Sequence, residues 1–290
     1  MPNCDIQYAD GSDILAVEKI AKTADAVVIL AGYNREDEGE FVSEKIGIGG
    51  DRKESLGLKK DEIDIINTVN AVNANTVVVL IGGNMIMLDK WCENVSSIMM
   101  AYYPGMEGGN VIASTLFGDN NPGGKLPFVI PHMESDLPKT DWLADEIEYE
   151  YYHGYAKLDK ENIEPMYHYG HGLSYTTFKI GDSDISVKNN EIVAKCKIKN
   201  TGEVKGDEVV QLYIGFENSK IDRPIKLLRG FKRITLGKNE EDTVQITCPL
   251  EKLKWYNQES NLWELEDMVY SAYIGNSSDE KRLQKLEFKL

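Results

Sequence analysis

Three uninterrupted apolar runs stand out in the first half of the chain, at residues 26–30, 76–81 and 97–102. Short runs of this kind are typical of strands that are buried on both faces of a parallel sheet. Apolar residues at helical spacing precede the first two runs: Ile14, Val17, Ile20 and Ala21, then Ile63, Ile66, Val69 and Val72. The alternation of helix and strand predicts an α/β fold with a doubly wound, largely parallel sheet.

The hydrophobic period changes to two from about residue 176. Apolar residues alternate with polar ones over 192–198, 210–214 and 244–248, and turn-forming residues separate these stretches. This pattern predicts an all-β antiparallel sandwich. The intervening stretch is rich in tyrosine and has no clear period, so it reads as an ordered connection. We therefore predict an α/β lobe over 1–135, a connection over 136–175 and a sandwich over 176–290.

Charge is distributed unevenly over the 290 residues, whose formal net charge is −16. Residues 1–150 contain 26 Asp and Glu against 11 Lys and Arg, whereas residues 151–290 contain 22 against 21. So acidic a first half repels phosphate backbones and anionic lipids, which argues against nucleic acid or membrane partners. A neutral small molecule such as a sugar fits this composition.

The chain shows neither a membrane-length apolar run nor the profile of a signal peptide, so a cytoplasmic location is expected. Its four cysteines are scattered, without CxxC pairs or histidines at zinc spacing. We therefore predict no metal site and no cofactor. GxSxG and HExxH motifs are also missing from the sequence, which leaves serine hydrolase and zinc protease chemistry unsupported.

The densest chemical signal is the acidic stretch 36–40, which holds Glu36, Asp37, Glu38 and Glu40. It follows the first predicted strand, and loops beyond the carboxyl ends of strands form the ligand crevice of open α/β sheets. Crowded carboxylates raise one another's proton affinity, which is one way to make a general acid. A solvated acidic turn is the alternative interpretation.

A glycine-rich stretch, 47–52, matches neither the dinucleotide-binding nor the phosphate-loop pattern. A loop bent by glycines explains it better. In that loop we expect Asp51 and Arg52 to form an ion pair that fixes the backbone.

Several longer motifs occur along the chain in the same order as in one known protein family. The chain resembles, nearly end to end, the C-terminal lobes of glycoside hydrolase family 3, the β-glucosidase and β-xylosidase family. The motifs lie at residues 36–40, 50–52, 56–58, 103–109, 117–127, 169–178, 200–202, 206–213 and 228–231.

The resemblance implies an α/β-sandwich lobe followed by a fibronectin type III-like domain. In this family a separate (β/α)8 barrel carries an Asp nucleophile, and the α/β lobe supplies the acid/base carboxylate. The family's Glu-Gly element corresponds best to Glu38-Gly39, so Glu38 is the implied general acid/base; Glu36 and Glu40 are second choices, one alignment step away. The implied reaction is hydrolysis of terminal β-linked sugars, most often glucose, with retention of configuration.

The chain also differs from the family in two respects that bear on its function. No barrel is present, and the chain begins near the family's Tyr8-Ala9-Asp10-Gly11 region, without an opening strand and helix. A sheet that lacks its first elements exposes an edge, which favours a partner or an oligomer. We expect a component of a split or processed enzyme that needs a barrel-bearing chain and is inactive alone.

Two alternatives remain open. The chain could be a non-catalytic carbohydrate-binding or assembly module derived from such an enzyme. The sandwich could instead be the functional part, binding a polymer or a protein. Trp255 and Trp263 could stack on sugar faces, although packing in the core or at an edge is the favoured interpretation of both.

Overall fold

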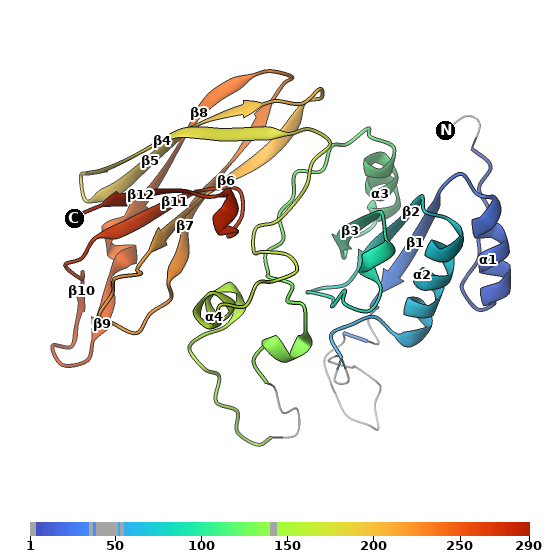
Figure 1. The fold of residues 1–290 in the computed structure, drawn as a ribbon, viewed down its shortest axis with the longest axis horizontal. Helices are drawn as coiled ribbons and strands as arrows, with labels where there is room; N and C mark the ends of the chain where they lie inside the picture. The colour runs from blue at the N-terminus through green and yellow to red at the C-terminus, as the bar shows by residue number, and fades with distance from the viewer. Residues whose placement is uncertain (1–3, 35–36, 39–51, 53–54, 140–143) are drawn as a thin grey trace. The chain divides into compact units, whose positions relative to one another are not determined.

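The computed structural model describes residues 4–34, 37–38, 52, 55–139 and 144–290. The chain forms two compact units (Figure 1). The α/β unit comprises Met1–Ile112 and Ile130–Ile147, and the sandwich unit comprises Ala113–Val129 and Glu148–Leu290.

The α/β unit is built around a parallel sheet of three strands in the order β1-β2-β3. Helices α1 and α2 pack against each other, and α2 also packs on the sheet (Figure 1). Its elements are α1 (Ile14–Thr23), β1 (Val27–Gly32), α2 (Lys60–Val72), β2 (Thr76–Ile81), η1 (Cys92–Asn94), β3 (Ser97–Tyr102) and η2 (Glu134–Asp136). The helix α3 (Gly108–Leu116) begins in this unit and ends in the sandwich unit.

Burial explains why these segments form strands and helices. Val78 and Val79 of β2 point to opposite faces of the sheet, and both are fully buried. Ile66 and Val69 give α2 its buried stripe. The Asp13 side chain caps α1 by accepting hydrogen bonds from the N–H groups of the first turn, which are otherwise unpaired. The parallel α/β layer predicted from the apolar runs is confirmed.

The sandwich unit has two antiparallel sheets, in the orders β12-β11-β6-β7 and β4-β5-β8, and a hairpin of β9 and β10. Its core is formed by the alternating apolar positions of the strands, as predicted. The elements are α4 (Gly154–Glu161), β4 (Phe178–Lys188), β5 (Glu191–Asn200), β6 (Gly206–Gly215), β7 (Lys226–Leu236), β8 (Glu241–Pro249), η3 (Leu250–Leu253), β9 (Trp255–Asn257), β10 (Leu262–Glu264), β11 (Tyr270–Gly275), η4 (Glu280–Arg282) and β12 (Gln284–Phe288).

Part of the tyrosine-rich connection is the helix α4, which the sequence pattern did not indicate. Its eight residues are anchored by Leu158, which is almost fully buried, and Asn162 ends it in the left-handed conformation. The hydroxyl of Tyr155 accepts a hydrogen bond of 3.0 Å from the Leu228 N–H of β7. This stretch is therefore part of the packing of the sandwich unit.

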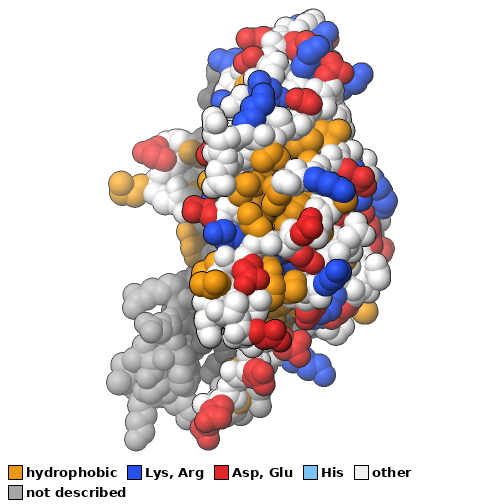
Figure 2. Space-filling model, turned by 90° about the vertical axis from the view of Figure 1, so that its left-hand side faces the viewer, with side chains coloured by type: hydrophobic (Ala, Val, Ile, Leu, Met, Phe, Trp, Pro, Cys, Tyr) orange, Lys and Arg blue, Asp and Glu red, His pale blue; other side chains and the backbone are white. Residues whose placement is uncertain are grey.

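Charges of both signs are interspersed on the face of the molecule shown in Figure 2. Apolar side chains lie among them. In the β9–β10 hairpin, the exposed large apolar side chains are those of Tyr256, Leu262 and Trp263. None of the helices in the described part of the chain is long and apolar enough to cross a bilayer.

Candidate active site

Three loops meet at the carboxyl end of the parallel sheet. Glu38 lies in the loop after β1, Gly83 in the loop after β2, and Tyr103 directly after β3. Because the strands are parallel, their carboxyl ends lie at one edge, and this edge is where open α/β sheets bind ligands. The acidic stretch was predicted to lie at this edge, and its two described residues, Asp37 and Glu38, follow β1 there.

A tight turn fixes the backbone that carries Glu38. The carbonyl of Asn34 accepts hydrogen bonds from the N–H groups of both Asp37 and Glu38, each 3.1 Å long. The carboxylate of Asp37 accepts the Asn34 N–H at 3.1 Å and pairs with the Lys59 ammonium at 2.6 Å. Burial acts to raise the pKa of Asp37, but its hydrogen bonds to Lys59 and Asn34 outweigh it and hold that pKa below its usual value.

The carboxylate of Glu38 is held by three hydrogen-bond donors. Its Oε1 lies 3.0 Å from Nε of Arg52, and the two side chains are only 13% and 9% exposed, respectively. Its Oε2 accepts the Gly83 N–H at 2.7 Å and also the hydroxyl of Tyr103. These are the contacts that an ionised carboxylate makes, because every partner donates.

Arg52 is itself fixed from two sides. Its Nη1 donates a 2.7 Å hydrogen bond to the carbonyl of Met85, and its guanidinium lies 4.8 Å from the centre of the Tyr33 ring. The Tyr33 hydroxyl donates in turn to the carbonyl of Gly57. A planar cation held in this way presents one fixed donor edge to Glu38.

The hydroxyl of Tyr103, a residue 52% exposed, has a raised pKa. Burial, followed by its hydrogen bond to Glu38 and the negative charge there, raises the pKa of Tyr103 to about 12. Its hydroxyl is therefore a permanent neutral group beside the carboxylate. A neutral hydroxyl can both donate and accept a hydrogen bond, unlike the other two partners of Glu38.

The structure brings together two of the residues singled out in the sequence, Glu38 and Arg52. The second choices Glu36 and Glu40 lie outside the described residues, as does Asp51, the expected ion-pair partner of Arg52. Sequence reasoning did not identify Gly83 and Tyr103 as partners of Glu38. The signal that could have found them is their position, because each closely follows a predicted strand of the same parallel sheet.

No group of three or more His, Cys, Asp or Glu side chains in the described ranges is placed to hold a metal ion. Among the described residues of this edge, the groups placed around the Glu38 carboxylate are a guanidinium, a backbone N–H and a phenol.

A parallel α/β lobe followed by a β-sandwich is the combination of folds that the resemblance seen in the sequence implied. Comparison with known proteins gives the family. Residues 7–175 match the glycosyl hydrolase family 3 C-terminal domain, and residues 208–278 match the fibronectin type III-like domain. The chain belongs to glycoside hydrolase family 3, which confirms the resemblance seen in the sequence.

Relatives include beta-glucosidase BoGH3A of Bacteroides ovatus, which is 34% identical over 280 residues covering 92% of this chain and 36% of the relative. A beta-xylosidase of Formosa agariphila is 34% identical over 290 residues, covering 94% of this chain and 38% of the relative. The crystal structure of a Kluyveromyces marxianus beta-glucosidase in complex with glucose superposes with a TM-score of 0.84 at 32% identity, covering 98% of this chain and 34% of that one. The chain thus spans about a third of the length of the curated relatives it matches.

Proposed function

We propose that this chain supplies the general acid/base of a retaining β-glycosidase, with Glu38 in that role and the nucleophile on polypeptide outside these 290 residues. The observation that carries the proposal is the fixed, largely buried Glu38 carboxylate at the carboxyl edge of the sheet. The substrate we propose is a terminal β-linked neutral sugar, with glucose the first choice. The named relatives, a β-glucosidase and a β-xylosidase, support this class.

The reaction has two steps in which Glu38 acts in opposite senses. In the first, protonated Glu38 gives its proton to the leaving oxygen while the nucleophile bonds to the sugar. In the second, ionised Glu38 takes a proton from the water that releases the sugar. The two carboxyl groups must lie about 5–5.5 Å apart for this chemistry.

The contacts of Glu38 in the structure suit the second step, because all three partners donate hydrogen bonds to its carboxylate and Glu38 is ionised when that step begins. In the first step one carboxyl oxygen must carry a proton, so one partner has to accept a hydrogen bond. Arg52 Nε and Gly83 N–H can only donate, whereas the hydroxyl of Tyr103 can rotate and accept. We therefore assign Tyr103 as the residue that positions Glu38 in both of its protonation states.

A leaving-group comparison tests the role of Glu38 in the active complex, which is the chain assembled with its barrel-bearing polypeptide. Glu38→Gln keeps the size of the side chain and removes the transferable proton. For an aryl β-glucoside with a poor leaving group, such as 4-methoxyphenol, we expect kcat/KM to fall about 10²–10⁴-fold. For 2,4-dinitrophenyl β-glucoside, whose leaving group needs no acid, the fall should be much smaller.

Asp64→Asn is the matched control, because Asp64 is a half-exposed carboxylate on α2 that pairs with Lys60. It should change neither substrate's kcat/KM. If Glu38→Gln lowers kcat/KM equally for both substrates, or fails to assemble, the role of the carboxylate is to hold the three loops together. The chain would then be an assembly module.

A further inference from the structure

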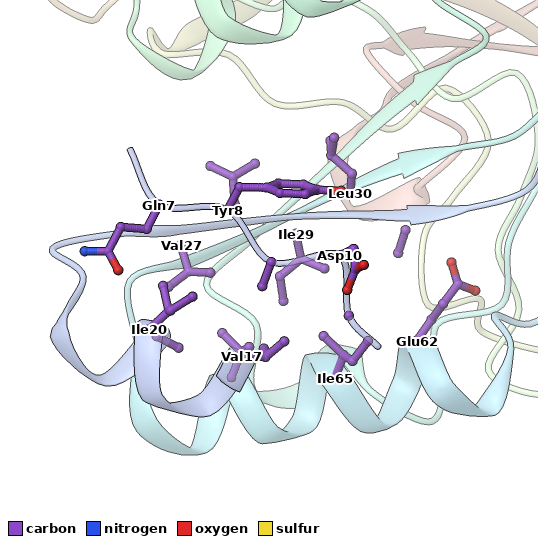
Figure 3. Close-up of a pocket in the computed structure, with 16 residues that line it drawn as sticks. Gln7, Tyr8, Asp10, Val17, Ile20, Val27, Ile29, Leu30, Glu62 and Ile65 are labelled. Carbon is purple, nitrogen blue, oxygen red and sulfur yellow. The ribbon is translucent and has the colours of Figure 1, made fainter. Parts of the chain in front are cut away.

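Two apolar features of the structure lie outside the candidate active site. One is a pocket of about 320 Å³ among α1, α2, β1 and the segment before α1 (Figure 3). Most of its lining is aliphatic, and it lies within the packing between the helices and the sheet, so it indicates no particular ligand. The other is a pair of exposed aromatic rings, Tyr256 and Trp263, on the β9–β10 hairpin of the sandwich unit.

The hairpin stands apart from the body of the sandwich. β9 and β10 pair with each other in a separate two-stranded sheet, and neither belongs to the two sheets that enclose the core. In Figure 1 the hairpin extends beyond the end of those sheets. Tyr256 and Trp263 are not members of the hydrophobic core of the unit. The packing of the sandwich therefore does not explain the two rings.

Strand register places the two rings on one face of the hairpin. Tyr256 lies directly opposite Trp263, and the next pair is Trp255 with Glu264. Because side chains alternate along a strand and opposite residues share a face, Trp255 lies on the other face. Trp263 is 64% exposed and Tyr256 is 44% exposed, whereas Trp255 is half-buried. Packing was the favoured interpretation of both tryptophans, but Trp263 presents most of its surface to solvent.

Contacts within the hairpin fix the relative position of the rings. The ring centres of Tyr256 and Trp263 are 5.5 Å apart, and the ring planes meet at 60°. The Tyr256 hydroxyl donates a 3.2 Å hydrogen bond to the side-chain oxygen of Asn261, which sits in the turn in the left-handed conformation. Across the hairpin the Asn257 side chain donates to Glu264 at 3.0 Å. A ligand that touches both rings therefore meets a surface that is already ordered.

An indole face with a second ring standing beside it suits a pyranose sugar. The face of an aromatic ring is electron-rich, so it attracts C–H groups that carry partial positive charge. The hydroxyls of β-linked glucose are all equatorial, so C–H groups cover both faces of the sugar and the hydroxyls lie along its rim. The hairpin turn offers that rim neutral hydrogen-bonding side chains, namely Gln258, Ser260 and Asn261.

Charge and size argue against other occupants. Residues 251–267 contain five acidic and two basic side chains, which disfavours nucleic acid and anionic lipid. Two rings on strands of three residues each are also much smaller than the surface of about 800 Å² that each partner buries in a stable protein complex. A neutral sugar matches the hairpin in both respects.

We propose that Tyr256 and Trp263 form a binding surface for a neutral β-linked oligosaccharide. The indole of Trp263 stacks on the face of one sugar ring, while the Tyr256 ring and the side chains of the turn contact its rim. This surface holds a carbohydrate without cutting it. It goes beyond the proposed function, because it belongs to the sandwich unit whereas Glu38 belongs to the α/β unit.

Residue-resolved NMR of the whole chain tests this, with cellohexaose as the probe because it is a neutral β-linked glucan. The chain has four tryptophans, so the indole N–H signals can be assigned with variants that replace one tryptophan at a time by phenylalanine. Millimolar cellohexaose should shift the indole signal of Trp263 and the backbone amide signals of the hairpin turn. The shifts should saturate with a single dissociation constant.

Three variants, followed through the backbone amides of the turn, separate stacking from folding. Trp263→Ala should weaken cellohexaose binding about tenfold, which is the scale of one aromatic contact. Trp263→Tyr keeps a ring at this position and should retain most of the affinity. Phe231→Ala is the matched control, because it removes a ring that is 67% exposed on β7 of the same unit. It should leave the affinity unchanged.

Three results would overturn the proposal: no saturable shift at the hairpin, equal affinity in Trp263→Ala and the natural chain, or affinity as low in Trp263→Tyr as in Trp263→Ala. Hairpin signals that move with protein concentration in the absence of sugar would also overturn it, because a second copy would then cover the rings. Because no hydrolysis is measured, failure here leaves the role of Glu38 untouched, and failure of the leaving-group test leaves this surface untouched.

Discussion

The two units of this chain differ in how completely the apolar side chains of their strands are buried. In the sandwich unit the core strands are paired, and even the buried Asn200 side chain is hydrogen-bonded to Thr176, Val204 and Leu236. In the α/β unit the edge strand β1 leaves the aliphatic side chains of Val28 and Leu30 48% and 65% exposed. The difference teaches that the proposed acid/base residue belongs to the unit whose strands are less completely buried.

The prediction with the largest expected effect tests whether the interior of the sandwich unit is shielded from water. The ammonium of Lys226 is 1% exposed and lies 2.7 Å from Asp159 and 3.2 Å from Glu280. Lys226→Ala leaves Asp159 partly buried without its cation, so the free energy of unfolding should fall by about 3–5 kcal/mol. Denaturant titration measures this.

The control for Lys226 is Lys238→Ala, which breaks an exposed pair with Glu203. That change should cost no more than about 1 kcal/mol. Equal effects of the two substitutions would show that the sandwich interior is not closed to water.

A second pair of substitutions tests whether the units are stabilised independently. Ile66 in the α/β unit and Leu212 in the sandwich unit are both fully buried. Truncation of either to alanine should cost about 2–5 kcal/mol. We expect hydrogen exchange to accelerate only in the unit that carries the substitution. Acceleration across both units in either variant would contradict the comparison drawn above.

The smallest expected effect is a pH dependence within the α/β unit. Burial raises the pKa of Glu62, although its hydrogen bonds from Gly32 and Lys59 oppose this. The folded state therefore binds more protons than the unfolded state as pH rises from the ordinary pKa near 4.5 to the raised one. Stability falls with rising pH across that window and is constant above it.

Glu62→Gln keeps an acceptor for the Gly32 N–H and removes the titration. The variant should therefore gain stability relative to the natural chain as pH rises through the window. Thermal unfolding at a series of pH values checks this. A difference that runs in the opposite direction would mean that the hydrogen bonds of Glu62 outweigh its burial.

Much of the fold could be predicted because local pattern and burial agree. The apolar runs at 76–81 and 97–102 coincide with β2 and β3, and period-two alternation marked the sandwich. The helix α4 could not be predicted, because a single buried leucine supplies too little periodicity. Its stability comes from packing against the sandwich.

The candidate site was predictable only in part, for a different reason. The position of Glu38 after a buried strand indicated the correct edge of the sheet. Its partners Gly83 and Tyr103 are 45 and 65 residues away in the sequence. Only the register of three parallel strands brings them together, and that register is a property of the folded sheet.

The central claim is that this chain holds an acid/base residue without its nucleophile. The most direct test is to assay the purified chain alone with 2,4-dinitrophenyl and 4-methoxyphenyl β-glucosides, with light scattering and intact mass recorded on the same sample. We predict no turnover of either substrate. Turnover that survives repurification and disappears in Glu38→Gln would contradict the account, because a second carboxylate within the chain would then be the nucleophile.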